Sequence, residues 1–85
     1  MESKLGILAG GGPLPASIVQ SCLASAREVF VIAFKDETDP STCEGVAHLW
    51  VPLGKVGTII KRLKKENCVE VVLAGPIRRP SFSKL

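Results

Sequence analysis

One stretch decides the fold of this chain: Leu5-Gly6-Ile7-Leu8-Ala9-Gly10-Gly11-Gly12-Pro13-Leu14-Pro15. Its first half, residues 5–9, is uncharged and predicts a strand buried inside a parallel sheet. Three glycines follow, and glycine adopts backbone angles that other residues avoid. Pro13 then stands where the first turn of a helix tolerates proline. Strand, glycine turn and helix start together predict an anion site, because free backbone N–H groups and the positive end of the helix dipole meet there.

The rest of the chain alternates between apolar runs and helical periodicity. Helical spacing of apolar residues predicts two amphipathic helices, the second with a lysine-rich outer face. Runs of β-branched and aromatic residues predict three further strands. The polar stretch 35–45 predicts an exposed loop with a turn at Asp39-Pro40. The predicted helices cover about 13–26 and 55–66, and the later strands cover 29–34, 47–51 and 69–74.

This element order predicts an α/β fold, a Rossmann-like three-layer arrangement of four parallel strands in the order 3-2-1-4 with two helices. Two helices cannot cover both faces of such a sheet, so we expect some apolar surface to stay exposed. Ligands of these sheets bind at the carboxyl edge where the strand order reverses. The loop after the first strand and the loop after the fourth strand both lie at this edge, and both carry candidate contacts to a phosphate or diphosphate. Arg79, in the second of these loops, offers a forked set of N–H donors. These candidate substrate-binding residues are Gly10, Gly11, Gly12, Gly75 and Arg79.

Composition narrows the class of protein. The 85 residues form one small domain, 46% of them apolar, with a net charge of +3. Few aromatic residues and no tyrosine argue against nucleic acid as a partner. Three cysteines without a C-x-x-C pair predict reduced thiols in a cytoplasmic protein. The sequence shows no signal peptide, no apolar run long enough for a membrane span, and no pairing of nucleophile and base, so we expect no catalytic residue in this chain.

Other interpretations of the glycine stretch stay open. The glycines partly match the dinucleotide motif G-x-G-x-x-G, but Pro15 replaces its last glycine and no acidic residue closes the second strand. An NAD(P)-binding dehydrogenase piece is therefore one alternative. A stand-alone nucleotide-binding or regulatory module is another, and a tight turn without a ligand is a third. Arg79 could equally belong to a solvated basic tail.

Several short motifs occur in a specific order along the chain. They are Lys4-Leu5-Gly6-Ile7-Leu8-Ala9-Gly10-Gly11-Gly12-x-Leu14-Pro15, Asp39-Pro40, Gly54-x-x-Gly57, Ala74-Gly75 and Arg79-Pro80-x-Phe82-x-x-Leu85. In this order they resemble the start of the UDP-2,3-diacylglucosamine diphosphatases of Gram-negative lipid A biosynthesis, in the branch unrelated to calcineurin-like phosphoesterases. The resemblance covers essentially the whole chain.

The resemblance implies a two-domain enzyme of which residues 1–85 form the Rossmann-like N-terminal domain. It implies hydrolysis of UDP-2,3-diacylglucosamine to UMP and 2,3-diacylglucosamine 1-phosphate, assisted by Mg²⁺. The metal and the catalytic aspartate belong to a C-terminal domain that this chain lacks, so we expect the chain alone to be inactive. The implied partners are the substrate and the chain's own C-terminal domain. A homo-oligomer and a peripheral contact with the inner membrane from the cytoplasm are also compatible with this family.

Overall fold

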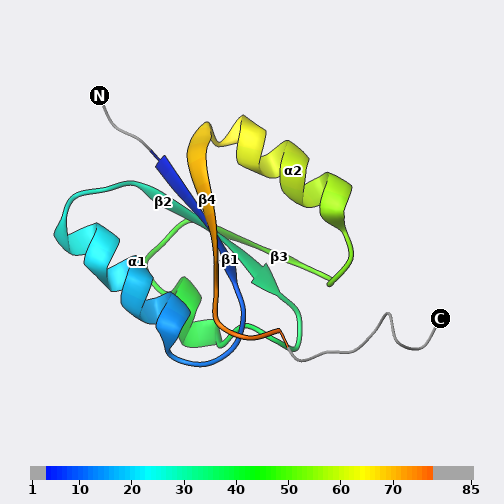
Figure 1. Cartoon of the computed structure of the whole chain (residues 1–85), viewed down its shortest axis with the longest axis horizontal. Helices are drawn as coiled ribbons and strands as arrows, with labels where there is room; N and C mark the ends of the chain where they lie inside the picture. The colour runs from blue at the N-terminus through cyan, green and yellow to red at the C-terminus, as the bar shows by residue number, and fades with distance from the viewer. Residues whose placement is uncertain (1–3, 78–85) are drawn as a thin grey trace.

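The computed structural model describes residues 4–77, and every predicted helix and strand is present with small differences at the ends. Asn67, which follows the second helix, adopts the left-handed conformation that often ends helices, with a φ of 61°. The helices and strands are labelled in Figure 1. In chain order they are β1 (Lys4–Ala9), α1 (Leu14–Ala24), β2 (Val29–Phe34), the 3₁₀ helix η1 (Pro40–Cys43), β3 (His48–Val51), α2 (Val56–Lys65) and β4 (Cys68–Ala74).

The four strands form one parallel sheet in the order β3-β2-β1-β4, which confirms the predicted topology. Strand β1 lies between β2 and β4, with Ile7 in register with Val31 on one side and Val72 on the other. Ala9 at the end of β1 is paired with Ala74 at the end of β4. The two loops that follow these residues therefore leave the sheet side by side at its carboxyl edge.

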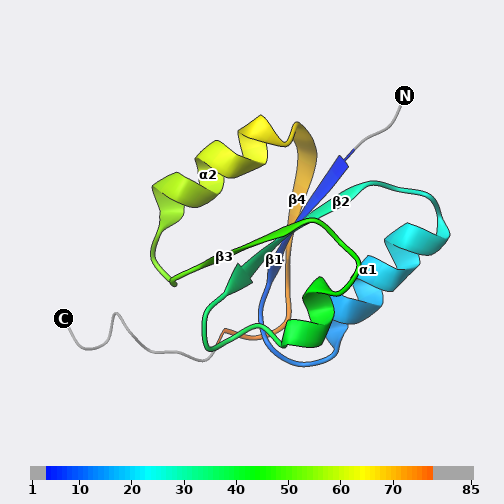
Figure 2. The same ribbon diagram turned by 180° about the vertical axis from the view of Figure 1, so that it is seen from behind.

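The two long helices lie on opposite faces of the sheet, as both views of the ribbon show (Figures 1 and 2). On one face, α1 and η1 cover the side chains of Ile7 and Val31, which are fully buried. On the other face, α2 packs through Ile59 and Leu63 against Phe30 and its neighbours. Strand β2 is buried at every position, which explains why its sequence contains no polar residue.

The loop predicted at 35–45 is wrong in part. The structure places the helix η1 within it and buries Thr38, Thr42 and Cys43. The Thr38 hydroxyl accepts a hydrogen bond of 2.7 Å from the Phe34 N–H and donates one to the Ala9 carbonyl. A polar side chain can be buried when its hydrogen bonds are satisfied, so the polar composition of this stretch did not reveal its packing.

Candidate functional site

The glycine turn after β1 is joined to the loop after β4 by backbone hydrogen bonds. The Gly10 N–H donates to the Ala74 carbonyl at 2.7 Å, and the Gly11 N–H donates to the Pro76 carbonyl at 2.9 Å. The expectation that the turn offers these N–H groups to a ligand is therefore wrong for both residues. Their donors hold the two loops together, so residues 10–11 and 74–76 form one hydrogen-bonded, closely packed unit at the carboxyl edge of the sheet.

Close packing explains why this unit needs glycine. A Cβ atom on Gly10 would lie 2.5 Å from the Pro76 carbonyl oxygen, and one on Gly11 would lie 2.8 Å from the Glu37 carbonyl oxygen. Gly75 has a φ of +84°, and a Cβ there would run into the Gly11 carbonyl. These three glycines let three backbone segments approach each other without side chains.

Gly12 is different, because a Cβ added to it would meet no atom within 4 Å. Its φ of +80° turns the chain from the packed unit into α1. Its N–H and those of Leu14 and Ala16 donate no hydrogen bond to another residue between positions 4 and 77. Pro13 and Pro15 have no N–H to offer. The open part of the predicted site is therefore Gly12 together with the first turn of α1, where the helix dipole is positive.

The first turn of α1 has no charged side chain or side-chain cap within the helix to compete with a bound anion. Helix α1 carries no charged side chain from Leu14 to Ala24, and its N-cap residue Pro13 makes no side-chain capping bond. The unpaired N–H groups and the helix dipole are therefore the local sources of positive potential within the helix. Such a position can take a phosphate oxygen without competing with a side-chain cap.

The sequence of this domain matches a known family along nearly its whole length. Residues 4–85 match the family model of the LpxI N-terminal domain. The chain belongs to the LpxI N-terminal domain family. A relative in Caulobacter vibrioides, named UDP-2,3-diacylglucosamine pyrophosphatase LpxI, is 39% identical over 82 residues. That match covers 96% of this chain and 29% of the relative, so this LpxI-family chain spans less than a third of the relative's length. The resemblance inferred from the motifs is thereby confirmed.

In this LpxI-family domain, the structure brings four of the five predicted site residues to one place. Gly10, Gly11, Gly12 and Gly75 meet at the carboxyl edge, although two of them serve the packing through their N–H groups. Arg79 lies outside the described residues, so its contribution stays a prediction. Ligand contact by the four glycines also stays a prediction.

Between positions 4 and 77, no group of three or more His, Cys, Asp or Glu side chains could hold a metal ion. Cys22, Cys43 and Cys68 are free thiols, and burial raises the pKa of Cys43 and of Cys68. A raised thiol pKa keeps the sulfur protonated and weakly nucleophilic near neutral pH. In the same part of the chain, neither helix is long and apolar enough to cross a membrane.

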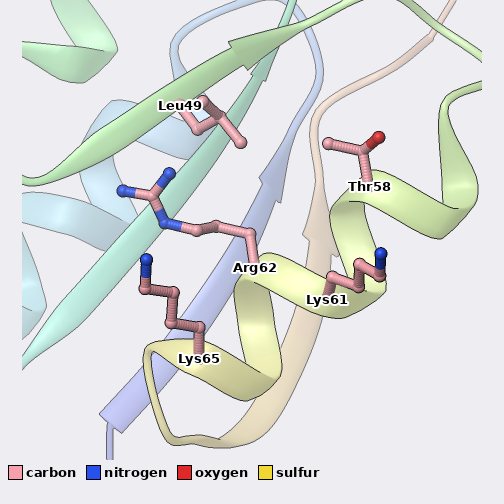
Figure 3. Close-up of a pocket in the computed structure, with 5 residues that line it drawn as sticks. All are labelled: Leu49, Thr58, Lys61, Arg62 and Lys65. Atoms are coloured by element: carbon pink, nitrogen blue, oxygen red, sulfur yellow. The ribbon is translucent and has the colours of Figure 1, made fainter.

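A hollow that was not predicted as a site lies between α2 and β3. This hollow of about 310 Å³ is lined by Leu49, Thr58, Lys61, Arg62 and Lys65 (Figure 3). The lysine-rich face of α2 was visible in the sequence, but no motif indicated that β3 would stand beside it. The hollow is thus a product of the sheet order.

Arg62 is held in place inside this hollow. Its Nε donates to Glu66 Oε2 at 2.9 Å, and its guanidinium carbon lies 4.9 Å from the centre of the Phe30 ring. Lys4 donates to the other carboxylate oxygen of Glu66 at 2.9 Å. The hydrogen bonds from Lys4 and then Arg62 lower the pKa of Glu66, so its carboxylate stays charged at neutral pH. The negative charge next to the hollow is therefore already neutralised by its partners.

Proposed function

We propose that this chain is the nucleotide-binding N-terminal domain of a lipid A pathway hydrolase acting on UDP-2,3-diacylglucosamine. The single observation that carries this proposal is the match to the LpxI N-terminal domain over residues 4–85. The relative from Caulobacter vibrioides carries that substrate in its name. The topology supports the proposal, because parallel sheets of this order bind ligands at the carboxyl edge beside the first strand.

In the proposed reaction, a water oxygen attacks the α-phosphorus of the substrate and the bond from that phosphorus to the bridging oxygen breaks. The products are UMP and 2,3-diacylglucosamine 1-phosphate, and the leaving oxygen stays on the sugar phosphate. The role of this domain is to bind and orient the nucleotide diphosphate. The N–H groups of Gly12, Leu14 and Ala16 are the proposed donors to its oxygens, and Arg79 is proposed to add a forked pair.

The residues between 4 and 77 do not fit a magnesium site, because they offer no suitable cluster of ligands. The proposal places Mg²⁺ and the catalytic aspartate in a C-terminal domain, and it expects the 85-residue chain alone to release no UMP. Its surroundings would be the cytoplasm next to the inner membrane, where the lipid substrate is found.

A chimera tests this proposal directly. The matching N-terminal segment of the Caulobacter relative is replaced by this chain, and UMP release from UDP-2,3-diacylglucosamine is measured. We expect the chimera to release UMP, with activity reduced by Gly12→Ala. A folded chimera without activity, or one unaffected by a change at the glycine turn, would favour a regulatory module or another nucleotide cofactor. The 85-residue chain alone serves as the inactive control.

A further inference from the structure

The charged side chains of this domain are unevenly distributed between its two faces. Helix α1 has none, whereas residues 55–65 contain Lys55, Lys61, Arg62, Lys64 and Lys65. The acidic residues of the long loop, Asp36, Glu37, Asp39 and Glu44, lie around η1, which packs on the α1 side of the sheet. The α2 face is thus the basic side of the molecule.

The lysines on this face are not neutralised by neighbours. Glu66 is the acidic residue at the end of α2, and Lys4 and Arg62 already occupy its two oxygens. Within residues 4–77, Lys61, Lys64 and Lys65 have no carboxylate partner. Their exposed ammonium groups are therefore available to an external anion.

Exposed aliphatic side chains lie along the same face. Val56 and Ile60 on α2 are 60% and 48% exposed, and on the edge strand β4 Leu73 is 66% exposed. Leu63 of α2 and Val71 of β4 both approach the Gly6 position, so this side of the helix lies against β4. Ile60 precedes Leu63 by one turn, which places the exposed aliphatics in one strip between α2 and the sheet edge.

We infer that the α2 face is a docking surface for an anionic lipid bilayer. Lysine ammonium groups would meet lipid phosphates, and the strip of Val56, Ile60 and Leu73 would enter the region below the headgroups. The inference rests on the proposed function, because a substrate with two acyl chains is found in a bilayer. Lysine is depleted in the cores of protein–protein interfaces, so a face that mixes free lysines with aliphatics favours a membrane over a protein partner.

The position of the glycine turn agrees with this docking. Helix α2 begins soon after β3 ends, so Val56 lies near the carboxyl edge that carries the turn. The hollow between α2 and β3 supplies a place for one lipid phosphate, because Arg62 is fixed there by Glu66 and Phe30. Figure 3 shows Arg62 and Lys65 extending from α2 on the side of Leu49. Docking by this face therefore brings the carboxyl edge close to the headgroups.

Vesicle sedimentation tests the inference on the 85-residue chain without substrate. We expect the chain to bind phosphatidylcholine vesicles that contain phosphatidylglycerol, to bind pure phosphatidylcholine weakly, and to be released by salt. Lys61→Gln and Lys65→Gln should each weaken binding about fivefold, and together about thirtyfold. Ile60→Ser should weaken it further at high salt, where the electrostatic part is screened. The matched control is Glu44→Gln, which also changes the net charge by one unit but lies at the end of η1 on the α1 side of the sheet, and it should change binding less than twofold.

Three results would overturn the docking surface. They are no binding to anionic vesicles, equal binding to both kinds of vesicle, and an effect of Glu44→Gln on binding as large as that of Lys61→Gln. Self-association through the same face without vesicle binding would assign the aliphatic strip to a second copy instead. Thermal melting of each variant shows that it is folded. UDP binding is measured separately, so a failure of docking leaves the proposed function standing and a failure of UDP binding removes that function without removing docking.

Discussion

Replacing Gly10 with alanine should destabilise the domain far more than replacing any exposed glycine. The new Cβ would lie 2.5 Å from the Pro76 carbonyl oxygen, and the nearby Gly75 backbone leaves it no room to move. The strands must separate locally, which weakens the hydrogen bonds from Gly10 to Ala74 and from Gly11 to Pro76. Forcing atoms into a packed site costs about 1–3 kcal/mol, and each weakened hydrogen bond costs about 0.5–1.5 kcal/mol. We therefore expect the free energy of unfolding to fall by about 2–6 kcal/mol.

Two other glycines serve as controls for this measurement. Gly45 has a φ of +72° with open space around its Cβ position, so Gly45→Ala introduces backbone strain without a collision. That strain should cost about 1 kcal/mol. Gly57 lies in α2 with open space around it, and Gly57→Ala should stabilise the domain by about 0.5–1 kcal/mol. Urea denaturation of the variants gives the comparison. If Gly10→Ala costs no more than Gly45→Ala, the packed unit of residues 10–11 and 74–76 is not the structural joint described above.

Further predictions concern the nucleotide, the buried threonines and pH. Gly12→Ala should lower UDP affinity at least tenfold, because the new methyl group points into the open space where a phosphate would lie. Its melting temperature should shift no more than that of a Gly→Ala variant at another glycine with positive φ. Calorimetric titration measures the affinity. Thr38→Val should lower the free energy of unfolding by about 2–4 kcal/mol, because it leaves two buried backbone partners unsatisfied. Thr42→Val should leave the free energy of unfolding nearly unchanged, because the Thr42 hydroxyl has no partner between residues 4 and 77. The pKa of Glu66 is lowered in the folded domain, first by the hydrogen bond from Lys4. The Glu66 carboxylate therefore stabilises the fold at pH values above its unfolded pKa, and this stabilisation is lost as the pH falls through its folded pKa. Glu66→Gln should flatten this part of the acid denaturation profile.

The sequence was sufficient for the fold because its strongest signals are local. Strand β2 contains no charge and is buried on both faces, and the helix α1 between β1 and β2 makes a crossover of fixed hand. These two facts place β1 next to β2, and a second helix that crosses the other face brings β4 to the free side of β1. The order β3-β2-β1-β4 follows from element types alone.

The site was harder to predict because its contacts join distant parts of the chain. The N–H groups of Gly10 and Gly11 could be counted from the sequence, but their acceptors are the carbonyls of Ala74, at the end of β4, and of Pro76, in the loop after it. The burial of Thr38 depends on a hydrogen bond to Ala9, which hydropathy does not reveal. The hollow beside Arg62 requires β3 to stand next to α2. What remains of the predicted anion site is the part that the helix start alone determines.

Titration of the isotopically labelled chain with UDP tests the central claim most directly. Amide signals are followed in a nitrogen–proton correlation spectrum, with uridine as the control ligand that lacks phosphates. If the domain holds the diphosphate, the largest shifts with UDP should occur at the amides of Gly12, Leu14 and Ala16, and uridine should not produce them. The Asn67 amide, at the amino edge of the sheet just before β4, should not move. Shifts that are absent at the turn, or that UDP and uridine produce equally, would contradict the assignment of this domain as the nucleotide-diphosphate site.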